Sequence, residues 1–313
     1  KATQYTYDLG GNPTIVKDAL SRSTTYGYNY RGQVTTITDA LGYITALAYS
    51  GAGCASCQGN DKLVRVTDPS ANITHFQYDQ LGRLANETDP VGSITSFTYD
   101  AVGNPVQKTK ADGSIIIYTY DSVGRLTQKT YPDGSQTIYQ YDANGNLTGA
   151  ANQHSSYSFT YDNLNRLTSV HDNNNRTVQY QYDALGNRSR MTSPEGVITT
   201  YQYDANNRLS SITNDIGTFS YTYDAANRRT QQQNPNGSTV NYIYDKASRI
   251  TKIEHKTSGG AVIESFTYTY DAVGNRLTKV DTQGTSTYTY DALYELKQSK
   301  NPSLGTETYA YDK

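Results

Sequence analysis

The feature that most constrains the fold of this chain is a Tyr-Asp pair that recurs about every 21 residues. The pairs end at Asp8, Asp79, Asp100, Asp121, Asp142, Asp162, Asp183, Asp204, Asp224, Asp245, Asp271, Asp291 and Asp312. Tyr28-Asn29 and Tyr49-Ser50 keep the same frame, so residues 1–313 hold about fifteen registers. Such a period predicts one supersecondary unit per repeat, stacked on its neighbours. We expect a single repeat array over residues 1–313, and because both ends fall inside a repeat, we expect it to be a fragment of a longer repeat protein.

A second aromatic residue stands two positions before the tyrosine of each pair, except in one register, where Leu47 replaces it. Side chains of a strand alternate between its two faces, so both rings lie on the same side of a sheet. Leu, Ile, Val and Phe supply only 53 of the 313 residues, whereas there are 31 tyrosines. Because Tyr and Thr suit a pleated, half-buried surface, the fold class should be all-β.

The aspartate of each pair is followed, three residues later, by Gly or Asn in nearly every register. A carboxylate at the head of a type I turn accepts backbone N–H groups, and Gly or Asn tolerates positive φ at its end. A second strand and a second turn, such as Asp89–Gly92, complete the unit, so each repeat is one β-hairpin. Structural roles in the repeat are assigned to Tyr78, Asp79, Gly82, Tyr99, Asp100, Gly103, Tyr120, Asp121, Gly124, Tyr141, Asp142, Gly145, Tyr182, Asp183 and Gly186.

Tandem hairpins in this number cannot form a flat ribbon. Twisted open sheets rarely exceed about ten strands without curling or splitting. We therefore expect one long curled antiparallel sheet, in the form of a spiral or a shell wall.

The run from Gly92 to Asn104, GSITSFTYDAVGN, resembles the RHS or YD repeat, and the resemblance extends over essentially the whole chain. That family includes bacterial polymorphic toxins, insecticidal toxin-complex subunits, wall-associated proteins and the animal teneurins. The resemblance implies a β-sheet coiled into a hollow shell that often encloses a C-terminal toxin domain. It implies that the partners are other parts of the same parent polypeptide, as cargo or capping domains, and that the protein is bacterial and secreted or at the cell surface.

Charge and hydropathy exclude several other functions. The formal net charge is -2 and the pI is about 6.1, so the chain lacks the basic stripe of a nucleic-acid binder. No apolar run of about 18 residues is present, so no membrane span is expected. We expect no cofactor and no enzyme active site, because the repeated aspartates are explained by the turns and the four histidines fall at different phases of the repeat.

Two repeats are longer than the rest. The insertion 51–66 holds both cysteines, Cys54 and Cys57, which could form a disulfide or remain free thiols in a structural loop. A redox pair, half of a zinc site and an intermolecular disulfide are the alternatives. The insertion 254–265 is expected to be a surface loop around Ser258–Gly260.

The row of aromatic residues has two interpretations. Regular placement in every repeat favours packing between hairpins, whereas exposed aromatic rows also bind sugars. The chain is therefore expected to be a structural scaffold. The alternative is an extracellular adhesion module that binds carbohydrate or a cell-surface protein.

Overall fold

Alternating tyrosine and small polar residues form strands over nearly the whole chain. The computed structural model describes residues 2–51 and 61–312, and these ranges contain strands and turns but no helix. Two units are separated after Ser156. The prediction of an all-β chain of tandem hairpins is confirmed.

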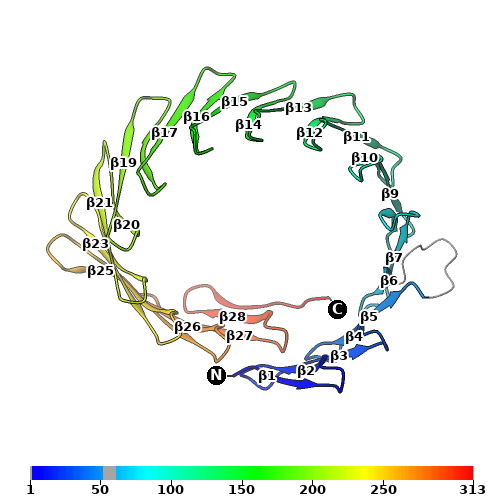
Figure 1. Cartoon of the computed structure of the whole chain (residues 1–313). Coiled ribbons are helices and arrows are strands. Elements are labelled where there is room, and N and C mark those ends of the chain that lie inside the picture. The colour runs from blue at the N-terminus through cyan, green and yellow to red at the C-terminus, as the bar shows by residue number, and fades with distance from the viewer. Residues whose placement is uncertain (1, 52–60, 313) are drawn as a thin grey trace. The chain divides into compact units, whose positions relative to one another are not determined.

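In the first unit, each strand pairs antiparallel with the next strand along the chain. The hairpins follow a curved path from β1 to β14, as Figure 1 shows. The strands are β1 (Gln4–Tyr7), β2 (Pro13–Lys17), β3 (Ser23–Tyr28), β4 (Val34–Thr38), β5 (Ile44–Tyr49), β6 (Leu63–Thr67), β7 (Ile73–Tyr78), β8 (Leu84–Thr88), β9 (Ile94–Tyr99), β10 (Pro105–Thr109), β11 (Ile115–Tyr120), β12 (Leu126–Thr130), β13 (Gln136–Tyr141) and β14 (Leu147–Ala151).

The second unit repeats the same architecture from β15, which begins at the boundary, to the last strand. Its sheet also curves along its length (Figure 1). The strands are β15 (Ser156–Tyr161), β16 (Leu167–Asp172), β17 (Thr177–Tyr182), β18 (Arg188–Thr192), β19 (Ile198–Tyr203), β20 (Leu209–Asn214), β21 (Gly217–Tyr223), β22 (Arg229–Gln233), β23 (Thr239–Tyr244), β24 (Ile250–Lys256), β25 (Val262–Tyr270), β26 (Arg276–Asp281), β27 (Gly284–Tyr290), β28 (Leu296–Asn301) and β29 (Gly305–Thr308).

The register of each hairpin shifts next to the turn that contains the aspartate. In the hairpin of β7 and β8, Gln77 pairs with Asn86 but Tyr78 pairs with Leu84. The extra residue on the second strand forms a bulge, and Gly82 has the left-handed φ of 76° that this geometry requires. Because a bulge increases the local twist of a strand pair, one bulge per repeat contributes to the curvature of each sheet.

Neither unit has a conventional hydrophobic core. Within residues 2–51 and 61–312 no hydrophobic side chain is buried. In β11, Ile115 and Ile117 on one face are 41% and 47% exposed, while Tyr118 and Tyr120 on the other face are half-buried. The sheets are therefore single layers, and each hairpin is stabilised by its neighbours along the sheet rather than by a second layer.

The two lengthened repeats differ from each other. In the insertion 51–66, the repeat frame resumes at Leu63, the first residue of β6, whereas Cys54 and Cys57 lie outside the described residues. In the insertion 254–265, strands β24 and β25 continue toward a turn between Thr257 and Ala261. The turn expected at Ser258–Gly260 is found there on exposed residues, and the strands on both sides of it extend into the insertion, so the repeat is a longer hairpin.

Candidate functional site

The turn that contains the aspartate is closed by the carboxylate and by the backbone together. In Asp79–Arg83, Oδ1 of Asp79 accepts hydrogen bonds from the amides of Leu81 and Arg83, both at 2.9 Å. The Gly82 amide donates to the Asp79 carbonyl at 2.9 Å. We call this five-residue segment the YD turn. The backbone amide of the fifth residue donates the same hydrogen bond to the carboxylates of Asp8, Asp79, Asp100, Asp121, Asp142, Asp162, Asp183, Asp204, Asp224, Asp245, Asp271 and Asp291.

In most registers the tyrosine of the Tyr-Asp position joins its hairpin to the preceding one. The hydroxyl of Tyr99 donates a 2.8 Å hydrogen bond to the carbonyl of Leu84, the first residue of β8. In most copies the partner lies fifteen residues back in the sequence. The bond is made by Tyr28, Tyr78, Tyr99, Tyr120, Tyr141, Tyr182, Tyr203, Tyr223, Tyr244, Tyr270 and Tyr290, which we call the YD tyrosines.

The last residue of the YD turn adds a second link between hairpins. The Nε of Arg83 donates to Oδ2 of Asp79 at 2.7 Å, and one of its terminal nitrogens donates to the carbonyl of Asp100 at 3.0 Å. Its guanidinium lies 4.6 Å from the centre of the Tyr99 ring. Arginine takes this position at Arg83, Arg125, Arg166, Arg208, Arg228 and Arg249.

Asparagine occupies the same position in other copies and makes the local bond, and Asn187 also donates to the side chain of Asn207 in the next hairpin. The side-chain amide of Asn104 donates to Oδ2 of Asp100 at 2.9 Å. The sequence reasoning missed this position, although its signal was present as an Arg or Asn four residues after most of the aspartates.

These contacts hold the aspartates ionised. The pKa of Asp79 is lowered, chiefly because its carboxylate accepts the Arg83 amide, with a further contribution from the Arg83 side chain. The pKa of Tyr99 is raised because its ring is partly withdrawn from water. A general acid or base at neutral pH needs a pKa near 7, and these shifts move both groups away from it. The chemistry of the YD turn is therefore that of a permanent hydrogen-bond acceptor.

The four histidines lie in different parts of the chain and make separate contacts. His171 shares a 2.8 Å hydrogen bond with Thr177, and His255 packs edge-on against Phe266 with 6.4 Å between the ring centres. His75 lies on β7, and His154 follows β14. Within the described ranges, no three His, Cys, Asp or Glu side chains are grouped so that they could hold a metal ion.

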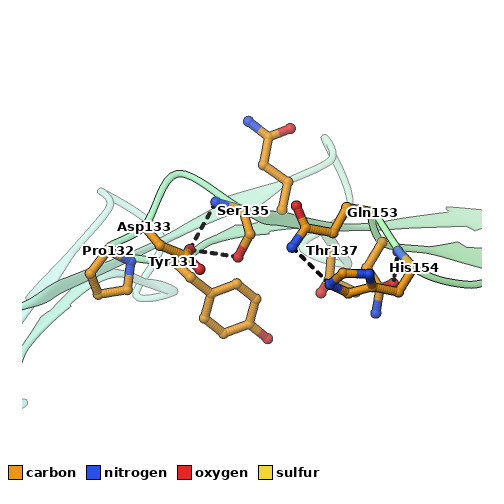
Figure 2. Close-up of a pocket in the computed structure, with 9 residues that line it drawn as sticks. Tyr131, Pro132, Asp133, Ser135, Thr137, Gln153 and His154 are labelled. Atoms are coloured by element: carbon orange, nitrogen blue, oxygen red, sulfur yellow. Dashed lines mark hydrogen bonds between the residues drawn. The ribbon is translucent and has the colours of Figure 1, made fainter.

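One pocket of about 570 Å³ lies at the opposite end of the hairpins from the YD turns, between two second turns of the first unit. It is lined by Tyr131, Pro132, Asp133, Ser135, Gln136, Thr137, Asn152, Gln153 and His154. Figure 2 shows Pro132 on one side of the Tyr131 ring and His154 on the other. Tyr131 does not belong to the aromatic row, and the sequence reasoning did not single it out.

Comparisons with known proteins agree with this geometry. The crystal structures of TcdB2-TccC3-Cdc42 and TcdB2-TccC3 are each similar with a TM-score of 0.57 and 18% identity, over 99% of this chain and 23% of theirs. A Tc holotoxin pore from Photorhabdus luminescens is similar with a TM-score of 0.55 and 18% identity, over 99% of this chain and 22% of that one. At this identity the likeness shows the fold alone, and the chain spans less than a quarter of these structures.

The sequence comparisons identify the repeat. None of the curated proteins matches the chain. No helix in the described ranges is long and apolar enough to cross a bilayer. The RHS Repeat family model matches residues 270–303, and the Teneurin YD-shell model matches residues 1–137 and 114–261. Because these last matches cover most of the sequence, the chain belongs to the Teneurin YD-shell family.

Proposed function

We propose that this chain is a structural scaffold, part of the wall of a hollow β-shell that encloses or displays another domain of the same polypeptide. A C-terminal toxin domain is the cargo we favour. The observation that carries the proposal is the link from Tyr99 to Leu84 and its recurrence in both units. A contact that fixes each hairpin to the next extends a wall by any number of repeats without a second layer.

The geometry of the YD turn supports a role without catalysis. The carboxylate of Asp121 is occupied by the amides of Val123 and Arg125 and by the Arg125 side chain, at 3.0, 2.9 and 2.6 Å. A catalytic carboxylate must instead be available to its substrate. We therefore assign structural roles to the YD tyrosines, to the aspartates and to the glycines that follow them, and no enzymatic role.

The aromatic row supports packing over ligand binding. The hydroxyl of Tyr141 donates a hydrogen bond to the Leu126 carbonyl, and the Arg125 guanidinium covers its ring at 4.8 Å from the ring centre. A ring covered by a guanidinium on one face and joined to the neighbouring strand offers little surface to a sugar. The similarity to a Tc toxin structure supports a secreted or cell-surface bacterial protein.

Small-angle X-ray scattering of the 313-residue chain tests the scaffold. A compact globule of this length would have a radius of gyration of about 20 Å. A curved single-layer wall gives a clearly larger value and a scattering curve of a bent sheet. A radius near the globular value would overturn the proposal.

A second experiment tests enclosure in the parent polypeptide. Limited proteolysis should leave a domain inside the wall intact, and Tyr-to-Phe substitutions at several YD tyrosines should make that domain cleavable by weakening the wall. Equal cleavage before and after these substitutions would leave no role for the wall in protecting the domain, and would contradict enclosure.

A further inference from the structure

The aromatic side chain of Tyr131 is not required by the turn in which it stands. The Gly134 amide donates to the Tyr131 carbonyl at 2.9 Å, and the Gly92 amide makes the same bond to Asp89 at 3.0 Å. Lys110 stands at the corresponding position of one repeat, and short polar residues stand there in most others: Asp18, Asp39, Asp68, Asp89, Asn152, Asp172, Ser193, Asn214, Asn234, Thr257, Asp281 and Asn301. A ring at this point therefore calls for an explanation other than folding.

The hydroxyl of Tyr131 has no hydrogen-bond partner among the described residues. Its side chain is half-buried and borders the pocket of about 570 Å³ beside Pro132 (Figure 2). The aromatic ring of Tyr131 and the neighbouring ring of Pro132 are the apolar part of a lining that is otherwise polar. One apolar surface among several hydrogen-bonding groups suits a polar ligand that has an apolar face of its own.

The polar side of the pocket is organised around Asp133. Its Oδ1 accepts the Ser135 amide at 2.9 Å and the Ser135 hydroxyl at 2.6 Å, which fixes the carboxylate and leaves Oδ2 without a partner in the described chain. Across the pocket, the side-chain nitrogen of Gln153 lies 2.9 Å from Nε2 of His154. Side-chain amides and hydroxyls of Gln136, Thr137 and Asn152 complete the lining.

We propose that this pocket binds a neutral carbohydrate, with the apolar face of one hexose or N-acetylhexosamine ring on Tyr131 and hydroxyls that donate to Asp133. The pocket volume falls in the range of sites for small ligands, about 300 to 1,000 Å³. The lining holds one carboxylate and no lysine or arginine, so an anionic ligand would be repelled. An apolar ligand would leave Asp133 and the amides unpaired, which is unfavourable. The proposal is independent of the scaffold function, because the pocket lies at the other end of the hairpins from the YD turns.

Saturation-transfer NMR and a glycan array with the 313-residue chain test the proposal. The probes are chitotriose, cellotriose, maltotriose and mannotriose in solution, and the same glycans carried by a protein on the array. An open pocket with one aromatic platform should give a Kd of about 1 mM for at least one probe. Binding to the free trisaccharide would point to a polysaccharide as ligand, and binding only on the array would point to a protein-borne glycan. Either result supports the site.

The chain offers matched variants for the key residues. Tyr131→Asn should weaken binding at least tenfold without changing thermal stability, because Asn152 and Asn234 occupy the same place in other turns. Tyr131→Phe should retain binding. Tyr30→Asn removes a tyrosine that is 89% exposed and lies in a YD turn, and it should have no effect.

The role of the Asp133 carboxylate can be tested without disturbing its turn. Asn236 accepts the Ser238 amide and hydroxyl at 3.0 and 2.7 Å, as Asp133 does from Ser135, so Asp133→Asn preserves the turn and should still weaken binding severalfold. The proposal is overturned if no probe shows saturation transfer at about 10 mM, well above the expected Kd. It is also overturned if Tyr131→Asn leaves the affinity unchanged.

Discussion

The hydroxyl of Tyr99 donates a 2.8 Å hydrogen bond to the carbonyl of Leu84 in the preceding hairpin. This bond explains why the two aromatic positions of the repeat tolerate different residues. Phe76, Phe97 and Phe159 occur two residues before the tyrosine of the pair, where a ring is sufficient, whereas the second position is tyrosine in every register, including the two in which another residue replaces the aspartate. The hydroxyl, rather than the ring alone, is what this position requires.

Tyr99→Phe should therefore destabilise the region around β8 and β9. Loss of the bond leaves the Leu84 carbonyl without its partner, at a cost of about 1 kcal/mol. Because a repeat array opens locally, amide hydrogen exchange is the suitable measurement, and protection should fall in these two strands first.

Tyr157→Phe provides the control for this substitution. The Tyr157 hydroxyl has no hydrogen bond to a described residue, and its ring stacks on Phe159 with 6.5 Å between centres. Removing this hydroxyl should leave exchange unchanged. Equal losses of protection in both variants would show that the bond from Tyr99 to Leu84 contributes nothing.

The contact of Arg83 with the Tyr99 ring predicts energetic coupling between these two residues. The guanidinium lies 4.6 Å from the ring centre, a geometry worth about 0.5 to 1 kcal/mol at an exposed site. Arg83→Asn should keep the local bond to Asp79, as Asn104 does to Asp100, and lose the contact with the next hairpin. A double-mutant cycle of Arg83→Asn with Tyr99→Leu should give a coupling of about this size.

A second cycle separates direct coupling from general weakening. Tyr120 belongs to the hairpin after the one that Arg83 contacts, and its hydroxyl bonds to Pro105. Arg83→Asn and Tyr120→Leu should therefore be additive. Coupling of similar size in both cycles would contradict a specific contact between Arg83 and Tyr99.

The sequence alone was sufficient to predict the hairpin period, because residues such as Tyr78 and Asp79 recur in a fixed frame and their chemistry is local. The partner of the Tyr99 hydroxyl could not be predicted, because the reach to Leu84 depends on the register between hairpins and on the bulge. The role of Arg83 could not be recognised from the sequence because the fifth residue of the YD turn is Arg in some repeats and Asn, as at Asn104, in others. Tyr131 was overlooked for the opposite reason, since a search for what repeats passes over the residue that departs from the repeat.

Gly82 is expected to tolerate asparagine better than alanine. Its φ of 76° lies in the left-handed region, where a residue with a Cβ is strained by about 1 to 2 kcal/mol. Asn165 occupies the same place in another YD turn with a φ of 59°. Thermal unfolding should show a larger loss for Gly82→Ala than for Gly82→Asn. The reverse order would mean that backbone strain does not govern this turn.

The lowered pKa values of the aspartates predict that the wall loses stability in acid. The carboxylates of Asp79 and Asp121 are held below their ordinary pKa, chiefly by the amides of Arg83 and Arg125. A group whose pKa is lower in the folded state binds fewer protons there than in the unfolded state, so stability rises with pH across that interval. The contribution is fully present above the unfolded pKa of about 4 and disappears as the pH falls through the lower folded value.

Asparagine at several of these positions should flatten the acid dependence. Asn29 already replaces the aspartate in one register, where its side-chain oxygen accepts the amides of Arg31 and Gln33 at 3.0 and 3.1 Å. The triple variant Asp79→Asn, Asp100→Asn and Asp121→Asn should keep the turns and unfold at a temperature that changes less between pH 5 and pH 2 than that of the unmodified chain. Asp215 is exposed and its carboxylate closes no turn by a hydrogen bond to a described residue, so Asp215→Asn controls for the loss of one negative charge. If Asp215→Asn flattened the profile as much per charge removed as the triple variant, general charge repulsion rather than the YD turns would account for the acid sensitivity.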